Sequence, residues 1–343
     1  MFRFGVVGCG HISQTAHLPS LRSIPEAKIV VVCDVREDIA KVIAERHKCE
    51  WTTDQNKVFE RQDLDAVSIL TPQTTHASLS IDALKCGKHV LLEKPMAMSS
   101  KEAKTMVETA KKHGLKLMVA HMKRYDSGVV KAKEVIEAGM IGEPVFGRFH
   151  QFGGEWVANR HIDVGTYGTY MDASYVPQKE PKGDVQVNKR EAFMSSWLNQ
   201  YSHDTNYMRF FLGDPSAVEI TSSYKEKIYG NWLSMFGVTL FSWDNELEAT
   251  LEFGEVSAKF WNEECQVYGD RGFLDLKHPV LLLWNQPAEL TVYTTKVEEF
   301  GADWLRYMPD WTTSYRNQYL HFLECLEKDL TPRTSGEDTV KDL

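Results

Sequence analysis

The strongest constraint on the fold is a glycine-rich turn at the start of the chain, between an apolar run and a helix-length segment. Phe2–Val7 leads directly into Gly8-Cys-Gly10-His-Ile-Ser13, a GxGxxG pattern with serine in the third glycine position. The first glycine permits a tight turn, the second lets a phosphate approach the backbone, and the third position must be small for the helix to pack on the strand. Phosphates also bind the free N–H groups of a helix N-terminus. The pattern predicts a dinucleotide cradle formed by Gly8, Gly10, His11, Ile12 and Ser13.

A carboxylate follows the second apolar run. Lys28–Cys33 ends at Asp34, where an acidic side chain binds the ribose diol of NAD and repels the 2′-phosphate of NADP. Arg36 lies two residues later, and an arginine there can pair with that phosphate. We therefore expect NAD as the cofactor, with NADP less favoured.

The same alternation of apolar runs and amphipathic segments continues to about residue 122. Ser99 and Glu102 form a capping box ahead of a helix expected to end near His113-Gly114. Runs that are apolar on both faces and separated by helices are typical of buried parallel strands. The sequence predicts a doubly wound Rossmann domain over 1–122, with further strands at Ala66–Leu70, His89–Leu92 and Lys116–Ala120.

After about residue 144 the hydrophobic pattern changes to a period of two. Phe236–Trp243 and Glu246–Phe253 flank the turn pair Asp244-Asn245, which predicts an antiparallel hairpin. We expect a second, α+β domain over 123–343, with a large, open, mostly antiparallel sheet and a last helix at about 314–326. Further strands are expected at Ser257–Trp261, Gln266–Tyr268, Val280–Trp284 and Leu290–Tyr293.

Composition excludes several classes of function. The 343 residues carry a net charge of −9, which disfavours a nucleic-acid surface. We find no apolar stretch long enough to cross a bilayer and no room for a signal peptide before the first strand. The six cysteines are scattered, with no CxxC pair, so we expect reduced thiols, a cytoplasmic location and no metal site.

Three later motifs give the chain a family resemblance. They are Thr71-Pro72-Gln-Thr-Thr-His76, Glu93-Lys94-Pro95 and His121-Met-Lys-Arg124-Tyr-Asp126, each after an expected strand. With the glycine pattern, the chain resembles the glucose–fructose oxidoreductase / inositol dehydrogenase / MocA family over nearly its whole length. The Lys-Arg-Tyr-Asp run is similar to the inositol dehydrogenase side of that family.

The resemblance implies an activity and an assembly. The family's usual reaction is reversible NAD(P)-dependent oxidation of a secondary alcohol on a sugar, inositol or related ring. One face of the open sheet carries substrate residues and the other often makes an oligomer contact, which implies a homodimer or homotetramer.

The resemblance also assigns roles at the strand ends. Lys94 points at the reacting hydroxyl in the family, and the bond to Pro95 is often cis; without the resemblance, a surface lysine before a turn is the alternative. Glu93 and Lys94 are both counted among the cofactor-binding residues, and Lys94 also among those that contact substrate. The family places Thr71, Pro72 and His76 along the nicotinamide ribose.

A helix expected over 197–212, stopped by Gly213, carries a candidate acid/base. Asn199, His203 and Asn206 are spaced i, i+4 and i+7 and share one face. The family usually has aspartates where this chain has the two asparagines, and its histidine is the general acid/base. An asparagine cannot raise the basicity of His203 as a carboxylate does, although Asn199 can still orient substrate. The alternative is a histidine satisfied within the helix packing.

Substrate contacts are expected from Arg124 and from the segment after 150. Arg124 is a candidate for substrate hydroxyls, or else an ion-pair partner of Asp126 or Glu137. His150, Trp156 and Arg160 lie in a segment whose aromatic and polar side chains suit either a sugar pocket or an oligomer arm. The run Trp304–Trp311 presents the same choice.

Two other functions use the same residues. One is an NAD-dependent glycosidase that oxidises its substrate transiently, with Lys94 and His203 serving again. The other is a non-catalytic regulator that binds NAD and a sugar, for which the two asparagines are the support.

Overall fold

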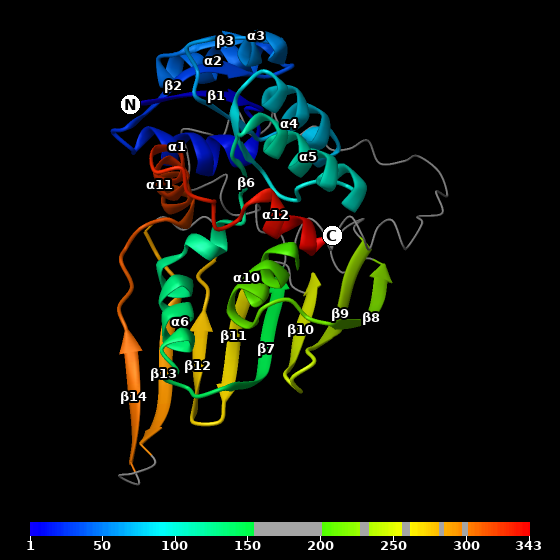
Figure 1. Ribbon diagram of the computed structural model, residues 1–343, viewed down its shortest axis with the longest axis vertical. Coiled ribbons are helices and arrows are strands. Elements are labelled where there is room, and N and C mark those ends of the chain that lie inside the picture. The colour runs from blue at the N-terminus through cyan, green and yellow to red at the C-terminus, as the bar shows by residue number, and fades with distance from the viewer. Residues whose placement is uncertain (154–200, 227–232, 256–260, 281–284, 297–300) are drawn as a thin grey trace. The chain divides into compact units, whose positions relative to one another are not determined.

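The computed structural model describes the chain except residues 154–200, 227–232, 256–260, 281–284 and 297–300. It divides into two compact units (Figure 1). Of the described residues, unit 1 holds Met1–Met122 and Tyr315–Leu343, and unit 2 holds those between Lys123 and Ser314. None of the described helices is long and apolar enough to span a membrane.

Unit 1 is built on a parallel sheet of six strands in the order β3-β2-β1-β4-β5-β6. This is the order of a dinucleotide-binding Rossmann fold, and it confirms the expected fold class. Its central strands are buried on both faces, as their apolar runs predict. The bounds are β1 Phe2–Val7, β2 Ala27–Cys33, β3 Glu50–Thr52, β4 Ala66–Ile69, β5 His89–Leu92 and β6 Leu117–Val119.

The helices of unit 1 begin and end at local signals. Ser99 caps α5 and accepts a hydrogen bond from the Glu102 N–H, and Gly114 ends the helix in the left-handed conformation, as expected. A π-helix, η1, follows the glycine turn and precedes α1. The bounds are η1 Ser13–His17, α1 Leu18–Arg22, α2 Glu37–His47, α3 Gln55–Phe59, η2 Gln73–Thr75, α4 His76–Lys85 and α5 Ser100–His113.

The C-terminal helix belongs to unit 1, which corrects the expected domain of 123–343. α11 (Ser314–Glu327) was expected at almost these residues, but from Tyr315 onward the chain packs in the first unit. The rings of Tyr319 and Phe322 lie 6.0 and 6.3 Å from the ring of Phe4 in β1. Burying this apolar face on the parallel sheet explains the return of the chain. The short α12 (Gly336–Thr339) and η6 (Val340–Asp342) follow.

Unit 2 contains an eight-stranded sheet in the order β14-β13-β12-β11-β7-β10-β9-β8. Only β7 and β10 pair in parallel; the other described pairs are antiparallel, as expected. The bounds are β7 Pro144–Gly153, β8 Ala217–Glu226, β9 Leu233–Ser242, β10 Glu248–Glu255, β11 Asn262–Gly269, β12 Gly272–Lys277, β13 Glu289–Lys296 and β14 Gly301–Tyr307.

The expected hairpin is β9–β10, and the expected strands at 266–268 and 290–293 lie within β11 and β13. The strands expected at 257–261 and 280–284 lie mostly outside the described residues. Their described residues, Trp261 and Val280, are not in strands. β7, β8, β12 and β14 were not expected as strands.

Two helices of unit 2 lie over the same face of its sheet, in front of it in Figure 1. They are α6 (Ser127–Glu137), against β12 and β13, and α10 (Ser202–Leu212), against β7. Alternation along β7 turns Phe149 toward α10, where its ring lies 5.4 Å from the Tyr207 ring. The short helix η3 (Met122–Tyr125) leads into α6.

Candidate functional site

The carboxyl ends of the parallel strands gather most of the expected cofactor residues at one edge of unit 1. Gly8 follows β1, Asp34 follows β2, Thr71 comes after β4, and Glu93 and Lys94 follow β5. Parallel strands end at the same edge of a sheet, which is where doubly wound folds bind their ligands. The sequence predictions for these residues therefore refer to one place.

The two glycines of the turn have different constraints. Gly8 has φ +96°, and a Cβ there would lie 2.5 Å from the Leu70 carbonyl oxygen, so a side chain is excluded. Apart from its chain neighbours, a Cβ on Gly10 would meet no atom of the described residues within 4 Å. Gly8 is thus required by the fold, whereas Gly10 borders open space of the kind a pyrophosphate needs. The turn fits a dinucleotide.

Asp34 is fixed by the backbone around it. Its Oδ2 accepts a hydrogen bond from the Cys9 N–H at 2.8 Å, and its Oδ1 accepts one from the Arg36 N–H at 2.9 Å. The carboxylate therefore stands at the end of β2 beside the glycine turn, where a ribose diol would be bound.

Glu93 and His17 form a buried pair behind Lys94. His17 Nε2 lies 2.8 Å from Glu93 Oε1, and Glu93 Oε2 accepts a hydrogen bond from the Lys94 N–H at 2.9 Å. Burial alone would raise the pKa of Glu93, but the His17 hydrogen bond and the neighbouring positive charges bring it below its usual range. His17 comes from η1, directly after the glycine turn, so the network joins the cradle to the strand that carries Lys94.

Tyr319 extends this network to the C-terminal helix. Its hydroxyl lies 3.1 Å from His17 Nδ1 and 3.0 Å from Ser68 Oγ at the end of β4. Sequence reasoning missed both His17 and Tyr319, because their partners lie far away along the chain.

Lys94 is half-buried, and its peptide bond to Pro95 is cis. Loss of water around the ammonium lowers the pKa of Lys94, and the charge of Glu93 opposes that shift. A lysine with a lowered pKa exchanges protons more readily near neutral pH.

His76 contacts both of the loops that follow β4 and β5. Its Nδ1 lies 2.7 Å from the Pro95 carbonyl oxygen and its Nε2 lies 2.8 Å from the Thr71 carbonyl oxygen. Burial lowers the pKa of this histidine. Because both ring nitrogens face protein oxygens, His76 holds the loop of Thr71 and Pro72 against the strand end that carries Lys94.

In unit 2, His203 is partly exposed in the first turn of α10. Arg124 holds this helix: its Nε and Nη2 donate to the Asn206 carbonyl oxygen at 3.0 and 2.7 Å, and its guanidinium lies over the Phe210 ring. Arg124 is buried, and the contacts described for it fix the position of α10. Asn206 is buried too, and Asn199 lies outside the described residues.

A buried charge cluster that sequence reasoning missed lies beneath α10. Lys123 pairs with Glu263 of β11 and with Asp204 of α10, where the Nζ–Oδ2 distance is 3.6 Å. All three side chains are buried, and burial raises the pKa of Asp204. In the sequence, Lys123 is part of the His121–Asp126 motif and Asp204 lies in the helix expected over 197–212, with no sign that the two side chains meet.

The structure separates His150 from His203. His150 follows Phe149 in β7 and therefore lies on the sheet face opposite α10. Its Nδ1 lies 2.8 Å from Glu252 Oε2, and its Nε2 lies 3.0 Å from Asn262 Nδ2. His150 and His203 therefore lie on different sides of the sheet, and the substrate contact expected of His150 stays a prediction. Trp156 and Arg160 lie outside the described residues.

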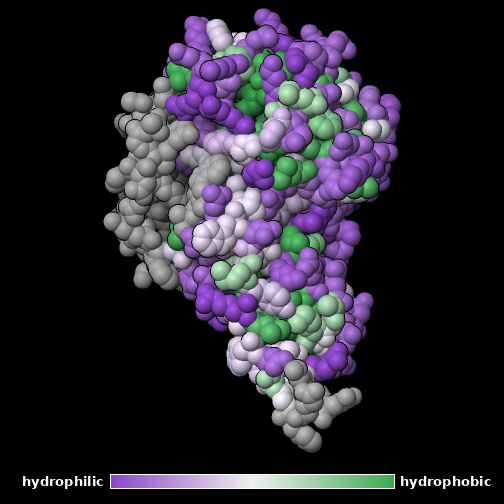
Figure 2. Space-filling view, turned by 90° about the vertical axis from the view of Figure 1, so that its left-hand side faces the viewer, coloured by the Kyte–Doolittle hydropathy of each residue, from purple (hydrophilic) through white to green (hydrophobic). Residues whose placement is uncertain are grey.

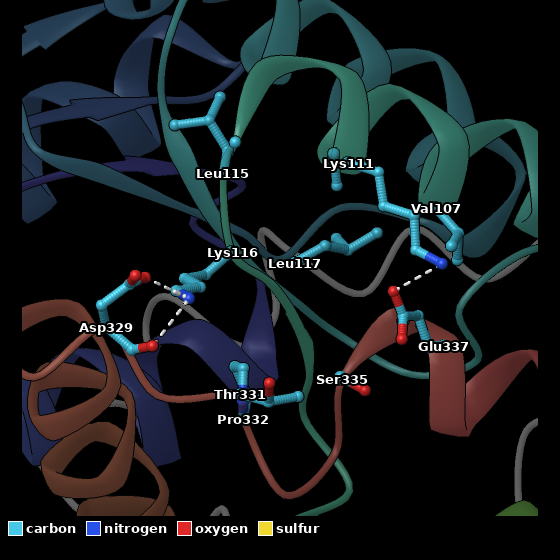
Figure 3. A pocket seen from close by; sticks show the side chains of 13 residues that line it. Val107, Lys111, Leu115, Lys116, Leu117, Asp329, Thr331, Pro332, Ser335 and Glu337 are labelled. Atoms are coloured by element: carbon cyan, nitrogen blue, oxygen red, sulfur yellow. Dashed lines mark hydrogen bonds and ion pairs between the residues drawn. The ribbon is translucent and has the colours of Figure 1, made fainter.

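A cavity of about 310 Å³ lies elsewhere in unit 1 (Figure 3). It opens between α5 and the C-terminal segment, at the amino end of β6, and ion pairs Lys111–Glu337 and Lys116–Asp329 cross its lining at 2.8 and 2.6 Å. None of the expected site residues that the structure describes lines it. Among the described residues, no group of histidine, cysteine and acidic side chains is placed to hold a metal ion.

Comparison with known proteins agrees with this architecture. Residues 2–121 match the family described as "Oxidoreductase family, NAD-binding Rossmann fold". An oxidoreductase of Formosa agariphila is 32% identical over 78% of this chain and 77% of its own length. A scyllo-inositol 2-dehydrogenase (NAD(+)) of Bacillus subtilis is 27% identical over 99% of this chain and 91% of its own.

The fold is also found among solved structures. An oxidoreductase from Agrobacterium radiobacter, crystallised with NAD+, superposes with a TM-score of 0.75 at 21% identity, covering 99% of this chain and 93% of that one. The chain belongs to the glucose–fructose oxidoreductase / inositol dehydrogenase / MocA family of NAD-binding oxidoreductases.

Proposed function

We propose that this protein is an NAD-dependent dehydrogenase or reductase acting on a secondary ring hydroxyl of a sugar or cyclic polyol. The observation that carries the proposal is the shared strand edge of unit 1, where the Gly8–Gly10 turn, Asp34 and Lys94 follow three strands of one parallel sheet. Nucleotide recognition and a titratable lysine thus meet at one edge.

Each residue has a proposed part. NAD, when bound, accepts or returns the hydride. Oxidation of a carbinol also needs an acceptor for the hydroxyl proton. We assign this role to Lys94, because burial lowers its pKa. Glu93 holds the Lys94 backbone through a hydrogen bond. We assign His203 as a second acid/base, and Asn199 as a substrate contact in place of the family's carboxylate.

The similarity to inositol dehydrogenases supports the substrate class. The Bacillus subtilis relative aligns over almost the whole length of both chains, and a myo-inositol 2-dehydrogenase of Thermotoga maritima is 25% identical over 98% of this chain. At such identities a few different side chains in the substrate pocket are enough to change which ring is bound and which of its carbons reacts.

A substrate screen tests the proposal. The full chain is incubated with NAD or NADP and a panel of inositols, hexoses, pentoses and amino sugars, and nucleotide reduction is followed by absorbance. We expect net NADH formation with at least one cyclic polyol or sugar. Glycoside cleavage without net NADH identifies the transient-oxidation glycosidase instead, and binding without turnover of any compound identifies the regulator.

We further propose that unit 2 forms a homodimer or homotetramer through the sheet face opposite α6 and α10. That face carries an aromatic row: Tyr268, Phe273, Tyr293 and Trp304 lie on four adjacent strands, with successive ring centroids 5.4, 5.7 and 5.1 Å apart. Trp304 is 64% exposed. Figure 2 faces the β14 edge of this sheet and shows pale and green side chains mixed with purple ones there. Exposed clusters of this kind mark interfaces.

The cytoplasm is the proposed location. All six cysteines are free, which is typical of a reducing compartment.

A further inference from the structure

The choice between NAD and NADP is made beside the adenosine ribose, at some distance from the glycine turn that holds the pyrophosphate. NADP differs from NAD by a 2′-phosphate on the adenosine ribose, and the residues after the second strand of a Rossmann fold face that position. In this chain they include Asp34, Arg36 and, in the first turn of α2, Asp38. One of the three side chains that decide specificity there is cationic.

The cationic side chain, Arg36, already forms an ion pair within the protein. Arg36 Nη2 lies 2.9 Å from Asp38 Oδ2, and the two side chains are 33% and 67% exposed. The hydrogen bond from Arg36 lowers the pKa of Asp38, so the partner is ionised at neutral pH. The Arg36 N–H is held by Asp34 at 2.9 Å, which fixes the backbone from which the guanidinium extends.

We propose that Asp38 is a specificity-determining residue: by binding the Arg36 guanidinium, it withholds from NADP a nearby cation that would pair with a 2′-phosphate. Asp34 repels that phosphate directly, and Asp38 removes the compensating attraction. Arginine pairs with phosphate in a two-pronged geometry, and the Asp38 carboxylate bound at Nη2 competes with the phosphate for that part of the guanidinium. The inference rests on NAD binding at this edge and is independent of which alcohol is oxidised.

The size of the effect follows from the exposure of the pair. Exposed ion pairs contribute little, so a phosphate competes with Asp38 at a modest disadvantage. We therefore expect removal of Asp38 to strengthen NADPH binding by about threefold to tenfold, and not to the level of NADH.

The experiment measures dissociation constants of NADH and NADPH for the full chain by titration of nucleotide fluorescence. Asp38→Ala is compared with Glu37→Ala, a matched control that removes the adjacent acid, which pairs with Lys41 at 2.6 Å. We expect Asp38→Ala alone to strengthen NADPH binding, with NADH binding unchanged within about twofold. Unchanged NADH binding also shows that the variant is folded.

The double variant Arg36→Gln/Asp38→Ala decides how Asp38 acts. We expect the gain in NADPH affinity to disappear when Arg36 is absent. A gain that persists without Arg36 means that Asp38 merely repels the phosphate, and it overturns the inference, as does an equal gain in Glu37→Ala or no gain in Asp38→Ala. Failure of the polyol screen leaves these binding measurements unaffected, so the two proposals fail separately.

Discussion

The imidazole of His17 and the carboxylate of Glu93, both buried, face each other at 2.8 Å between Nε2 and Oε1. Through this pair, the segment that follows the nucleotide turn is joined to the residue that precedes Lys94. The second oxygen of Glu93 holds the Lys94 N–H. Glu93 thus acts on Lys94 both as a hydrogen-bond acceptor and as a negative charge.

Replacing Glu93 by glutamine removes a negative charge that raises the pKa of Lys94. Burial already lowers that pKa, so the variant should lower it further. If oxidation requires neutral Lys94, the acid-side limb of the kcat/KM profile should move down by roughly half to one pH unit. Tyr319→Phe, which removes a neutral contact to His17, should leave the limb in place. A limb that stays fixed or rises in Glu93→Gln contradicts the assignment to Lys94.

The two glycines of the turn should respond differently to alanine. Gly10→Ala is expected to keep the thermal stability of the parent, because the added Cβ meets no atom of the part of the chain that the structure describes. It should weaken NADH binding at least about tenfold by occupying the phosphate space. Gly8→Ala should instead destabilise the fold by about 1–3 kcal/mol, because of its positive φ and the close Leu70 carbonyl. Melting curves and nucleotide titrations separate the effects. Parent-like NADH binding in Gly10→Ala would place the cofactor elsewhere.

The buried Lys123 should matter more for stability than an exposed lysine. Lys123→Met leaves Asp204 and Glu263 without their cation, and such a loss costs about 3–5 kcal/mol of unfolding free energy. Lys131→Met, which removes a surface pair with Glu134, should cost less than about 1 kcal/mol. Urea unfolding measures both variants. Equal costs would mean that the cluster does not stabilise α10.

The proposed oligomer depends on the aromatic row of the open sheet face. Trp304→Arg places a charge in that row and should shift the sedimenting species toward the monomer at micromolar concentrations. Trp51→Arg is the matched control, because Trp51 is also exposed but lies in unit 1. A parent protein that sediments as a monomer, or an oligomer unaffected by Trp304→Arg, contradicts this interface.

Local signals predicted much of unit 1. The apolar runs predicted five of its strands nearly to the residue, because both faces of each strand are buried. Ser99 and Gly114 predicted the two ends of α5, because helix caps act within a few residues. The three-residue strand β3 is exposed enough to carry no such pattern. In unit 2, β14 was not recognised because its aromatic and charged side chains are typical of a binding segment as well as of an edge strand.

The supporting residues of the site were not predictable, for a physical reason. Tyr319 meets His17 across 302 residues of chain, and no local pattern records such a contact. Charged residues such as Lys123 and Asp204 are expected at the surface unless their partner is known. The motifs therefore located the strand edge with Asp34 and Lys94, while the groups that fix these side chains became visible only in the fold.

Isotope transfer tests the central claim most directly. A polyol that turns over in the screen is prepared with deuterium on its carbinol carbons and incubated with NAD and either the parent or Lys94→Ala. We predict that the parent forms NADH carrying one deuterium, and that Lys94→Ala loses at least about 10²-fold in kcat while NADH affinity changes little. Reduced nucleotide without deuterium, or full activity in Lys94→Ala, would contradict the account.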